Sequence, residues 1–309
     1  MILKNLKNEE YHNSDKYAEF WSSTQLKEYK YSPKRAYFKK FFAEKKETPA
    51  LRWGTLIHDY LESKVRGTDF AAKYDIFEAP VNARTGQAYG VTSKAYQEAL
   101  SMFENPITIE ELNKLELIFK SITNSGQKQL IEHLIRVGTP EVSKFYTDGK
   151  LNLKIRPDLE TNTKIIDWKS IKSDSFSLDG IKKQIQNLNY GFSAAMYQWV
   201  TYKIEGVWKR FYWVFIESEP PFDFVIVDAA PYAYEIAKIG EQTIITPKVD
   251  AISFKAILDQ HIYSLENDFF QGLETQIQPD WRGQRIAELQ PSGYYLSKSL
   301  EFHNKKNKR

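Results

Sequence analysis

One segment of alternating residues most constrains the fold of this 309-residue chain. Residues 141–171 read EVSKFYTDGKLNLKIRPDLETNTKIIDWKSI, in which apolar and polar side chains alternate along short runs. Alternation with a period of two predicts β-strands that bury one face. Asp148-Gly149 is a typical hairpin turn, and Glu160–Thr163 provides a second turn. The segment therefore predicts a β-meander.

The rest of the chain predicts helices around this meander. Before it, helical structure is expected at 15–46, with a second helix starting at Ser32-Pro33, and helices are expected at 50–65, 93–104, 108–124 and 126–138, with a loop at 75–92. After it come a helix at about 180–204, two strands in KRFYWVFIES and FDFVIVDA, and helices at 231–246 and 250–271. The residues from Gly272 onward are expected to be irregular.

This order of elements predicts an α+β (α/β) fold in which helices flank a central mixed β-sheet. We expect a single domain over residues 1–309. Its helical N-terminal part covers about 1–138, its core about 139–228, and its helical or irregular C-terminal part about 229–309.

Composition excludes several kinds of site. The chain has no cysteine, which removes disulfides, thiolate zinc sites, iron–sulfur clusters and cysteine nucleophiles. No run approaches the ~20 apolar residues of a membrane span, and the N-terminal residues lack the apolar core of a signal peptide. We therefore expect a cytoplasmic protein with no membrane contact. The segment from Lys27 to Lys46 is basic, which suits phosphate groups or a solvated surface.

Three carboxylates and a lysine carry the chemistry of the meander. Glu141 is expected to begin its first strand, Asp158 to end the strand that starts near Lys150, and Asp167 to share a strand face with Lys169. Neighbouring strands lie ~5 Å apart, so these side chains can converge. Such a group suits metal-assisted phosphodiester hydrolysis, because carboxylate oxygens are ligands for Mg²⁺. A solvent-exposed set of salt bridges is the alternative.

A histidine on a predicted helix adds to this group. In WGTLIHDYLE, Gly54 lies one helical turn before His58. A glycine at that place permits close approach of another backbone or of a nucleic acid, and the imidazole is then able to reach a metal. A packed or exposed histidine is the alternative.

These motifs, in this order, resemble the PD-(D/E)xK nucleases, and most of all the exodeoxyribonuclease VIII type of phage and prophage recombination systems. The resemblance covers about residues 11–62 and 139–216, including RPD, DWK and the helix NYGFSAAMYQWV. It makes 139–228 a catalytic core. It implies a metal site of His58, Glu141, Asp158, Asp167 and the main-chain carbonyl of Trp168, holding Mg²⁺ or Mn²⁺.

The resemblance also assigns supporting roles. Lys169 is implied to position the nucleophilic water, with Asp158, Asp167 and Glu141 as its catalytic partners. DNA-binding or supporting roles are expected for Gly54, Arg156, Tyr190, Ser193, Tyr197 and the loop residue Arg84.

One motif departs from the family pattern. The helix usually carries Gln-x-x-x-Tyr, but with Tyr197 as the tyrosine the glutamine position is Ser193. The polar contact of that glutamine is then either missing or supplied by Gln184 or Gln186.

The family implies a 5′→3′ exonuclease that degrades one strand of linear duplex DNA and exposes a 3′ single strand for recombination. It implies Mg²⁺ without ATP, and the chain has no Gly-x-x-x-x-Gly-Lys-[Ser/Thr] motif. The resemblance further implies a homo-oligomeric ring of three or four subunits, a single-strand annealing protein as partner, and a bacterial host cell. An endonuclease or structure-specific nuclease of the same fold is an alternative, and a catalytically silent DNA-binding module is another.

Overall fold

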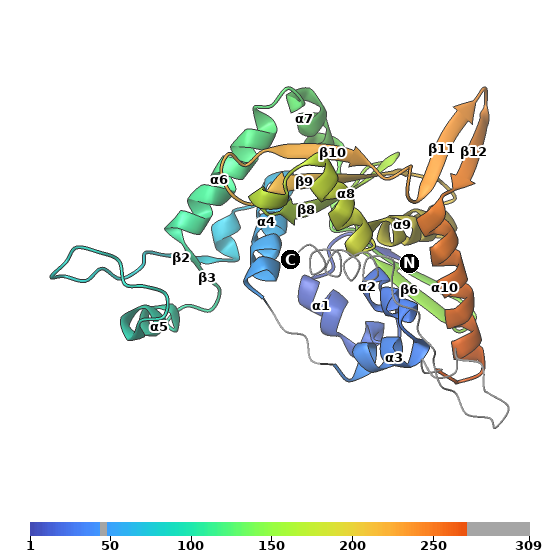
Figure 1. Ribbon diagram of the computed structural model, residues 1–309, viewed down its shortest axis with the longest axis horizontal. Coiled ribbons are helices and arrows are strands. Elements are labelled where there is room, and N and C mark those ends of the chain that lie inside the picture. Colours follow the sequence, from blue (N-terminus) through green and yellow to red (C-terminus); the bar gives the residue numbers. More distant parts are fainter. Residues whose placement is uncertain (44–47, 271–309) are drawn as a thin grey trace, which may run out of the picture.

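A five-stranded mixed sheet lies at the centre of the computed structural model, which describes residues 1–43 and 48–270 (Figure 1). The strand order is β10–β9–β8–β7–β4. The strands are β4 (Thr139–Pro140), β7 (Leu159–Glu160), β8 (Lys164–Ile171), β9 (Arg210–Glu217) and β10 (Phe224–Asp228). Within this sheet, β8 and β9 are the one parallel pair, and all the other neighbouring strands are antiparallel. The predicted mixed sheet flanked by helices is confirmed.

The parallel pair is joined by a helical crossover, as parallel strands require. Two helices make it, α8 (Leu178–Asn187) and α9 (Tyr190–Glu205). A single helix over 180–204 was the prediction, and it is wrong at Asn189, whose φ of 49° breaks the helical path. Asparagine is one of the few residue types that adopts this left-handed conformation readily.

The predicted meander divides between two sheets. The strands β5 (Ser143–Asp148) and β6 (Leu151–Ile155) form the expected hairpin around Gly149, whose φ is 56°. Together with β1 (Ile2–Leu3), which pairs with β5, they form a separate three-stranded sheet. The chain leaves this sheet at Arg156 and enters the central sheet at Leu159. Pro157 lies in between, and a proline cannot donate a ladder hydrogen bond.

The N-terminal third is helical but more broken than predicted. In its described part, the helical stretch expected over 15–46 consists of the 3₁₀ helices η1 (Asp15–Tyr17) and η2 (Lys27–Lys30) and the helices α2 (Ser23–Leu26) and α3 (Pro33–Phe41). The predicted start of a helix at Pro33 is confirmed, with Ser32 as its N-cap. The other helices here are α1 (Asn8–Asn13), α4 (Pro49–Arg66), α5 (Lys94–Leu100), α6 (Ile109–Thr123) and α7 (Lys128–Val137). A parallel pair, β2 (Asp75–Phe77) and β3 (Pro106–Thr108), begins and ends the segment that carries α5.

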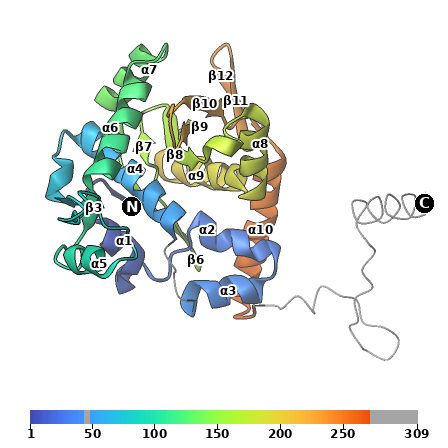
Figure 2. The ribbon, with the colours of Figure 1, turned by 60° about the vertical axis from the view of Figure 1, so that its left-hand side comes forward.

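Helices cover both faces of the central sheet (Figure 2), and each face has its own apolar core. On one face, α4, α6 and α7 pack against Ile166, Trp168 and Val214. On the other, α8, α9 and α10 (Val249–Glu266) pack against Ile165, Phe211 and Trp213. Side chains of successive strand residues point to opposite faces. This alternation places Asp167 and Lys169 on the α9 face and Trp168 on the α4 face.

The predicted helix over 231–246 is wrong. These residues form the hairpin of β11 (Tyr234–Ile239) and β12 (Gln242–Pro247), which stands apart at the upper right of Figure 1. Gly240 makes its two-residue turn with a φ of 61°, which glycine adopts at no steric cost. The run of β-branched residues that follows, from Thr243 to Thr246, favours a strand. The predicted helix at 250–271 is confirmed as α10.

A cluster of four charges, three of them buried and Glu205 half-buried, connects the two sheets. Lys144 of β5 and Lys209 both contact Glu160 of β7 and Glu205 of α9. The Lys144 side chain is 0% exposed and that of Glu160 5%. Because each charge has two partners of opposite sign, the cost of burial is offset within the cluster.

No helix of the described part of the chain is long and apolar enough to cross a membrane. The expectation of irregular structure from Gly272 onward lies outside the described residues.

Candidate metal centre

The helix α4 carries His58 toward the edge of the central sheet. It begins at Pro49, and the side chain of Thr48 accepts a hydrogen bond from the N–H of Leu51. Its apolar stripe of Leu56, Ile57, Tyr60 and Leu61 is buried against the sheet. This packing fixes the rotation of the helix, so His58 lies beside the stripe and faces Asp158.

Asp158 connects His58 to the central strand. Its Oδ1 lies 3.3 Å from His58 Nδ1. Its Oδ2 accepts a hydrogen bond of 2.6 Å from the N–H of Trp168. Asp158 lies directly before β7 rather than at the end of β6, so the predicted strand end is wrong by one element. The predicted approach of Asp158 to β8 is present.

Glu141 reaches the same place from a loop. It lies between β4 and β5 with a φ of 55°, and it does not begin a strand as predicted. Its N–H donates to the carbonyl of Asp158 at 3.2 Å. A positive φ is uncommon for glutamate, and here it turns the side chain back toward Asp158.

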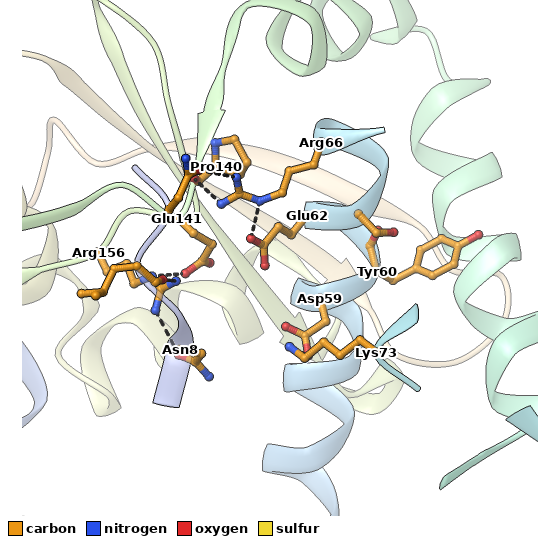
Figure 3. A network of polar contacts seen from close by, with 12 residues as sticks. Asn8, Asp59, Tyr60, Glu62, Arg66, Lys73, Pro140, Glu141 and Arg156 are labelled. Carbon is orange, nitrogen blue, oxygen red and sulfur yellow. Dashed lines mark hydrogen bonds and ion pairs between the residues drawn. The ribbon is translucent and has the colours of Figure 1, made fainter. Parts of the chain in front are cut away.

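The loop that carries Glu141 is held from opposite sides by two arginines, Arg156 and Arg66 (Figure 3). Arg156 Nε lies 2.6 Å from Glu141 Oε2, and the same guanidinium donates to the carbonyl of Leu6 at 2.8 Å. On the α4 side, Arg66 pairs with Glu62 at 2.7 Å and donates to the carbonyl of Pro140 at 3.3 Å. The loop is therefore held to the N-terminal segment through Arg156 and to α4 through Arg66.

These contacts bring three metal-ligand side chains together. One ligand atom each of His58, Glu141 and Asp158 lies within 4.8 Å of the other two. Carboxylate oxygens suit Mg²⁺ and Mn²⁺, and an imidazole nitrogen is also a common metal ligand. The donor set therefore fits a divalent cation.

Asp167 and Lys169 form a second, adjacent pair. Lys169 Nζ lies 2.5 Å from Asp167 Oδ2 and donates to the main-chain carbonyl of Trp168 at 3.2 Å. Both of these predicted metal ligands, Asp167 and the Trp168 carbonyl, thus contact the lysine. Asp167 is not a member of the three-residue group. Trp168 itself packs in the core on the α4 face, as predicted.

The charges of the centre shift one another's pKa values. Burial lowers the pKa of His58, but the charge of Asp158 outweighs it and raises the value to about 9. Burial and the charge of Asp158 raise the pKa of Glu141 to about 8. Burial raises the pKa of Asp167 to about 6, although Lys169 opposes it. A protonated His58 thus neutralises Asp158, and a metal ion at this place has to displace that proton.

The structure separates the roles of the residues on α9. Tyr190 lies at the site, since Lys169 Nζ is 5.3 Å from its ring centroid. Tyr197 is half-buried against Phe211, and it is also close to the centre, since burial, with the charges of Asp167 and Asp158, raises its pKa. Ser193 contacts Ser23 of α2 through an Oγ–Oγ distance of 3.1 Å.

Gln184 is the glutamine that reaches the centre. Its side-chain N–H donates to the carbonyl of Ser170 at 3.3 Å and lies 3.5 Å from the hydroxyl of Tyr190. Of the two alternatives for the expected glutamine contact, Gln184 lies at the site, and for Gln186 no side-chain contact is seen among the described residues.

Three other predicted residues have less direct places. A Cβ on Gly54 would lie in ordinary contact with Ser170 Oγ at 3.5 Å, so no close backbone approach among the described residues requires the glycine. Arg156 acts as the partner of Glu141. Arg84 is exposed in the segment between β2 and α5, which projects from the body at the left of Figure 1. The structure does not bring it to the centre.

Sequence reasoning missed two contributors. The first is the N-terminal segment, where the carbonyl of Leu6 and the side chain of Asn8 hold Arg156. The second is Lys27, which lies over the ring of Tyr190. Lys27 belongs to the basic run noted above and ends a Ser-x-x-Leu-Lys element that the resemblance to the family includes, but that element carried no role for it.

Comparison with known proteins decides the family. Residues 22–246 match the model of a PDDEXK-like domain of unknown function (DUF3799). The chain belongs to this family. Pro157-Asp158 and Asp167-Trp168-Lys169 are the residues that correspond to the PD and (D/E)xK elements of the pattern.

The fold is also seen in a solved structure. A crystal structure from Eubacterium rectale, described as a "Putative exonuclease", has a TM-score of 0.53 and 14% sequence identity, and the match covers 95% of this chain and 98% of that one. At this identity the likeness concerns the fold. No curated protein sequence matches the chain. Fold and family together support a nuclease of the PD-(D/E)xK superfamily.

Proposed function

We propose that this protein is a metal-dependent, ATP-independent exodeoxyribonuclease that degrades linear double-stranded DNA in the 5′→3′ direction and exposes 3′ single strands for recombination. The observation that carries the proposal is that two groups of residues lie next to each other beside the central strand β8. His58, Glu141 and Asp158 offer a divalent-cation site, and Asp167 and Lys169 form an ion pair on β8 itself.

The residues of the chain divide the chemistry between them. A bound Mg²⁺ or Mn²⁺ ion would lower the pKa of a coordinated water and neutralise phosphate charge. His58, Glu141 and Asp158 would hold that ion, with Asp167 and the carbonyl of Trp168 as further oxygen donors. Lys169 orients the attacking water and stabilises negative charge on the phosphate. Tyr190 and Gln184 fix the position of the lysine and of the strand end at Ser170.

One experiment tests both the activity and its direction. Linear duplex DNA labelled at either its 5′ or its 3′ end is incubated with the protein and Mg²⁺, beside a covalently closed circle. The proposal expects early release of the 5′ label, later loss of the 3′ label, and an intact circle. Cutting of the circle would establish an endonuclease instead, and no degradation of any DNA in Mg²⁺ or Mn²⁺ would overturn the nuclease.

Assembly and partners form part of the same proposal. We infer a ring of three or four subunits that encloses the duplex, and a single-strand annealing protein that receives the 3′ strand in the bacterial cytoplasm. Light scattering coupled to size-exclusion chromatography measures the assembly directly. A monomer that degrades DNA end by end would remove the ring from the proposal and leave the chemistry in place.

A further inference from the structure

A second lysine approaches the ring that Lys169 contacts. Lys27, the first residue of η2, has its Nζ 5.6 Å from the centroid of Tyr190, while Lys169 Nζ lies 5.3 Å from the same centroid. Lys27 also donates to the carbonyl of Leu188 at 3.0 Å. One tyrosine ring at the start of α9 therefore has two ammonium groups beside it.

The surrounding structure holds Lys27 in this place. The element α2 lies beside α9 in both ribbon views (Figures 1 and 2), and the Ser23–Ser193 contact joins the two. Leu26 is 0% exposed, and Tyr29 is buried with its hydroxyl 2.6 Å from His261 Nδ1. The buried residues on both sides of Lys27 fix its main chain, and the contact with the Leu188 carbonyl holds its side chain at the site. The side chain therefore loses less conformational entropy when it binds a ligand.

The charge of Lys27 is not balanced by a contacting carboxylate. Within residues 1–43 and 48–270, no ion pair includes Lys27, whereas Lys169 contacts Asp167. Asp167 and Asp250 act on Lys27 only through space, and Lys169 repels it. Burial, with the charge of Lys169, lowers the pKa of Lys27 to about 7. A cation held this way gains stability when an anion approaches.

We propose that Lys27 binds a backbone phosphate of the DNA strand held at the metal centre, next to the phosphate that Lys169 serves. The inference rests on the proposed nuclease function and deepens it, because it names a contact with the substrate strand. Lys27 is partly exposed, so the ammonium group is open to a ligand, and a phosphate provides the charge that its surroundings lack.

The salt dependence of DNA binding tests this contact. A labelled linear duplex is titrated with protein in EDTA, which leaves the DNA intact, at salt concentrations from about 50 to 200 mM. Each lysine–phosphate contact contributes close to 1 to the slope of log K against log salt. Lys27→Gln keeps a donor for the Leu188 carbonyl but removes the charge, and we expect its slope to be less steep by about 1. Lys27→Arg keeps the charge and should restore the wild-type slope.

Lys203 provides a matched control on the same helix. Its Nζ lies 5.2 Å from the ring centroid of Trp199, so it is also an exposed lysine over an aromatic ring. It lies 13 residues after Tyr190 on α9, which is about 20 Å along the helix axis. Lys203→Gln should leave the slope unchanged. Because the slope does not depend on the fraction of active protein, partial unfolding of a variant does not imitate the expected result.

The outcomes separate this inference from the proposed function. An unchanged slope in Lys27→Gln overturns the inference, whether or not the protein cleaves DNA, and so does a wild-type protein that binds no DNA. A reduced slope in Lys27→Gln, restored in Lys27→Arg, supports it even if the wild type shows no cleavage with Mg²⁺. In that last case only the proposed nuclease function would fail.

Discussion

The main-chain N–H of Trp168 donates a hydrogen bond of 2.6 Å to Asp158 Oδ2. This contact fixes one oxygen of Asp158 to the central strand β8, and it leaves the other oxygen to face His58 at 3.3 Å. The register between β7 and β8, in which Leu159 lies opposite Ile166, therefore sets the geometry of the metal centre.

The protonation state of His58 should follow the charge of Asp158. Asp158→Asn removes the charge that raises the pKa of His58 to about 9, while burial continues to lower it. We expect the pKa of His58 to fall to its ordinary value of about 6.5 or below. NMR titration of the metal-free protein measures it, with His58→Gln to assign the signal. A His58 pKa still near 9 in Asp158→Asn would contradict this pairing.

Replacing Lys169 should separate cleavage from binding. Lys169→Met keeps the apolar stem but loses the ammonium group beside Asp167, and we expect cleavage to slow by roughly 10²–10³-fold. Binding of DNA in EDTA should weaken far less. Lys164→Met, at the opposite end of the same strand β8, is the matched control and should cleave like the wild type. Equal losses in the two variants would remove the special role of Lys169.

Removing Arg156 should cost both stability and activity. Arg156→Met leaves the carboxylate of Glu141 without its ion-pair partner, in a place where the two side chains are only 8% and 17% exposed. At pH 9, above the pKa of about 8 that burial and the charge of Asp158 give Glu141, we expect the free energy of unfolding to fall by about 3 kcal/mol. Urea denaturation measures it, and the double variant Arg156→Met/Glu141→Gln should lose less than the sum of the single losses. Additive losses would show that the pair does not interact.

Ser193 and Gln184 should respond differently to truncation. Ser193→Ala removes its contact with Ser23, which is worth about 1 kcal/mol of stability, and it should leave the cleavage rate unchanged. Gln184→Ala removes a hydrogen bond beside Tyr190, and a similar loss of about 1 kcal/mol in the transition state would slow cleavage roughly fivefold. Steady-state cleavage rates of both variants decide. A slow Ser193→Ala beside a normal Gln184→Ala would reverse these roles.

A buried histidine far from the metal centre should make the protein less stable in acid. Burial, with the charge of Lys40, lowers the pKa of His261 to about 3, below its unfolded value of about 6.5. The unfolded chain then binds the extra proton, so stability is complete above pH 6.5 and is lost as the pH falls toward 3. At pH 5 the loss is about 2 kcal/mol.

The comparison with His261→Gln isolates this contribution. The drop in unfolding free energy between pH 7.5 and pH 5 should be smaller in the variant by about 2 kcal/mol, because both proteins share the same carboxylates. Urea denaturation at the two pH values measures the difference. An equal drop in the two proteins would show that His261 is not held neutral.

The sequence predicted those parts of the site that depend on the side-chain period of a single strand or helix. Alternation along KIIDWKSI placed Asp167 and Lys169 on one face and Trp168 on the other, because the side-chain period of a strand is fixed. The apolar stripe of Ala50–Val65 gave α4 and the side on which His58 lies. The family pattern then supplied the partnership of His58 with Asp158, which lie 100 residues apart.

The remaining features depend on contacts that sequence spacing does not contain. The positive φ of Glu141 is held by contacts with Arg156, with the backbone of Asp158 and, through Pro140, with Arg66 of α4. Arg156, Asp158 and Arg66 are not close neighbours of Glu141 in the sequence. The sequence of the hairpin at 234–247 also fits a helix, because its isoleucine and alanine residues match the helical period of 3.6 as well as the strand period of two. The turn at Gly240 and the β-branched run from Thr243 to Thr246 distinguish the two, but a single glycine and a short β-branched run are weak signals.

The buried cluster of Lys144, Glu160, Glu205 and Lys209 has a consequence for engineering. Exchanging one member leaves a partner's charge buried without compensation, which is far more harmful than exchanging all four for apolar residues of similar volume. Substitution libraries that vary these positions one at a time therefore pass through destabilised single variants. A heat-resistant form of this protein is therefore more accessible by a single concerted replacement than by a sequence of individual steps.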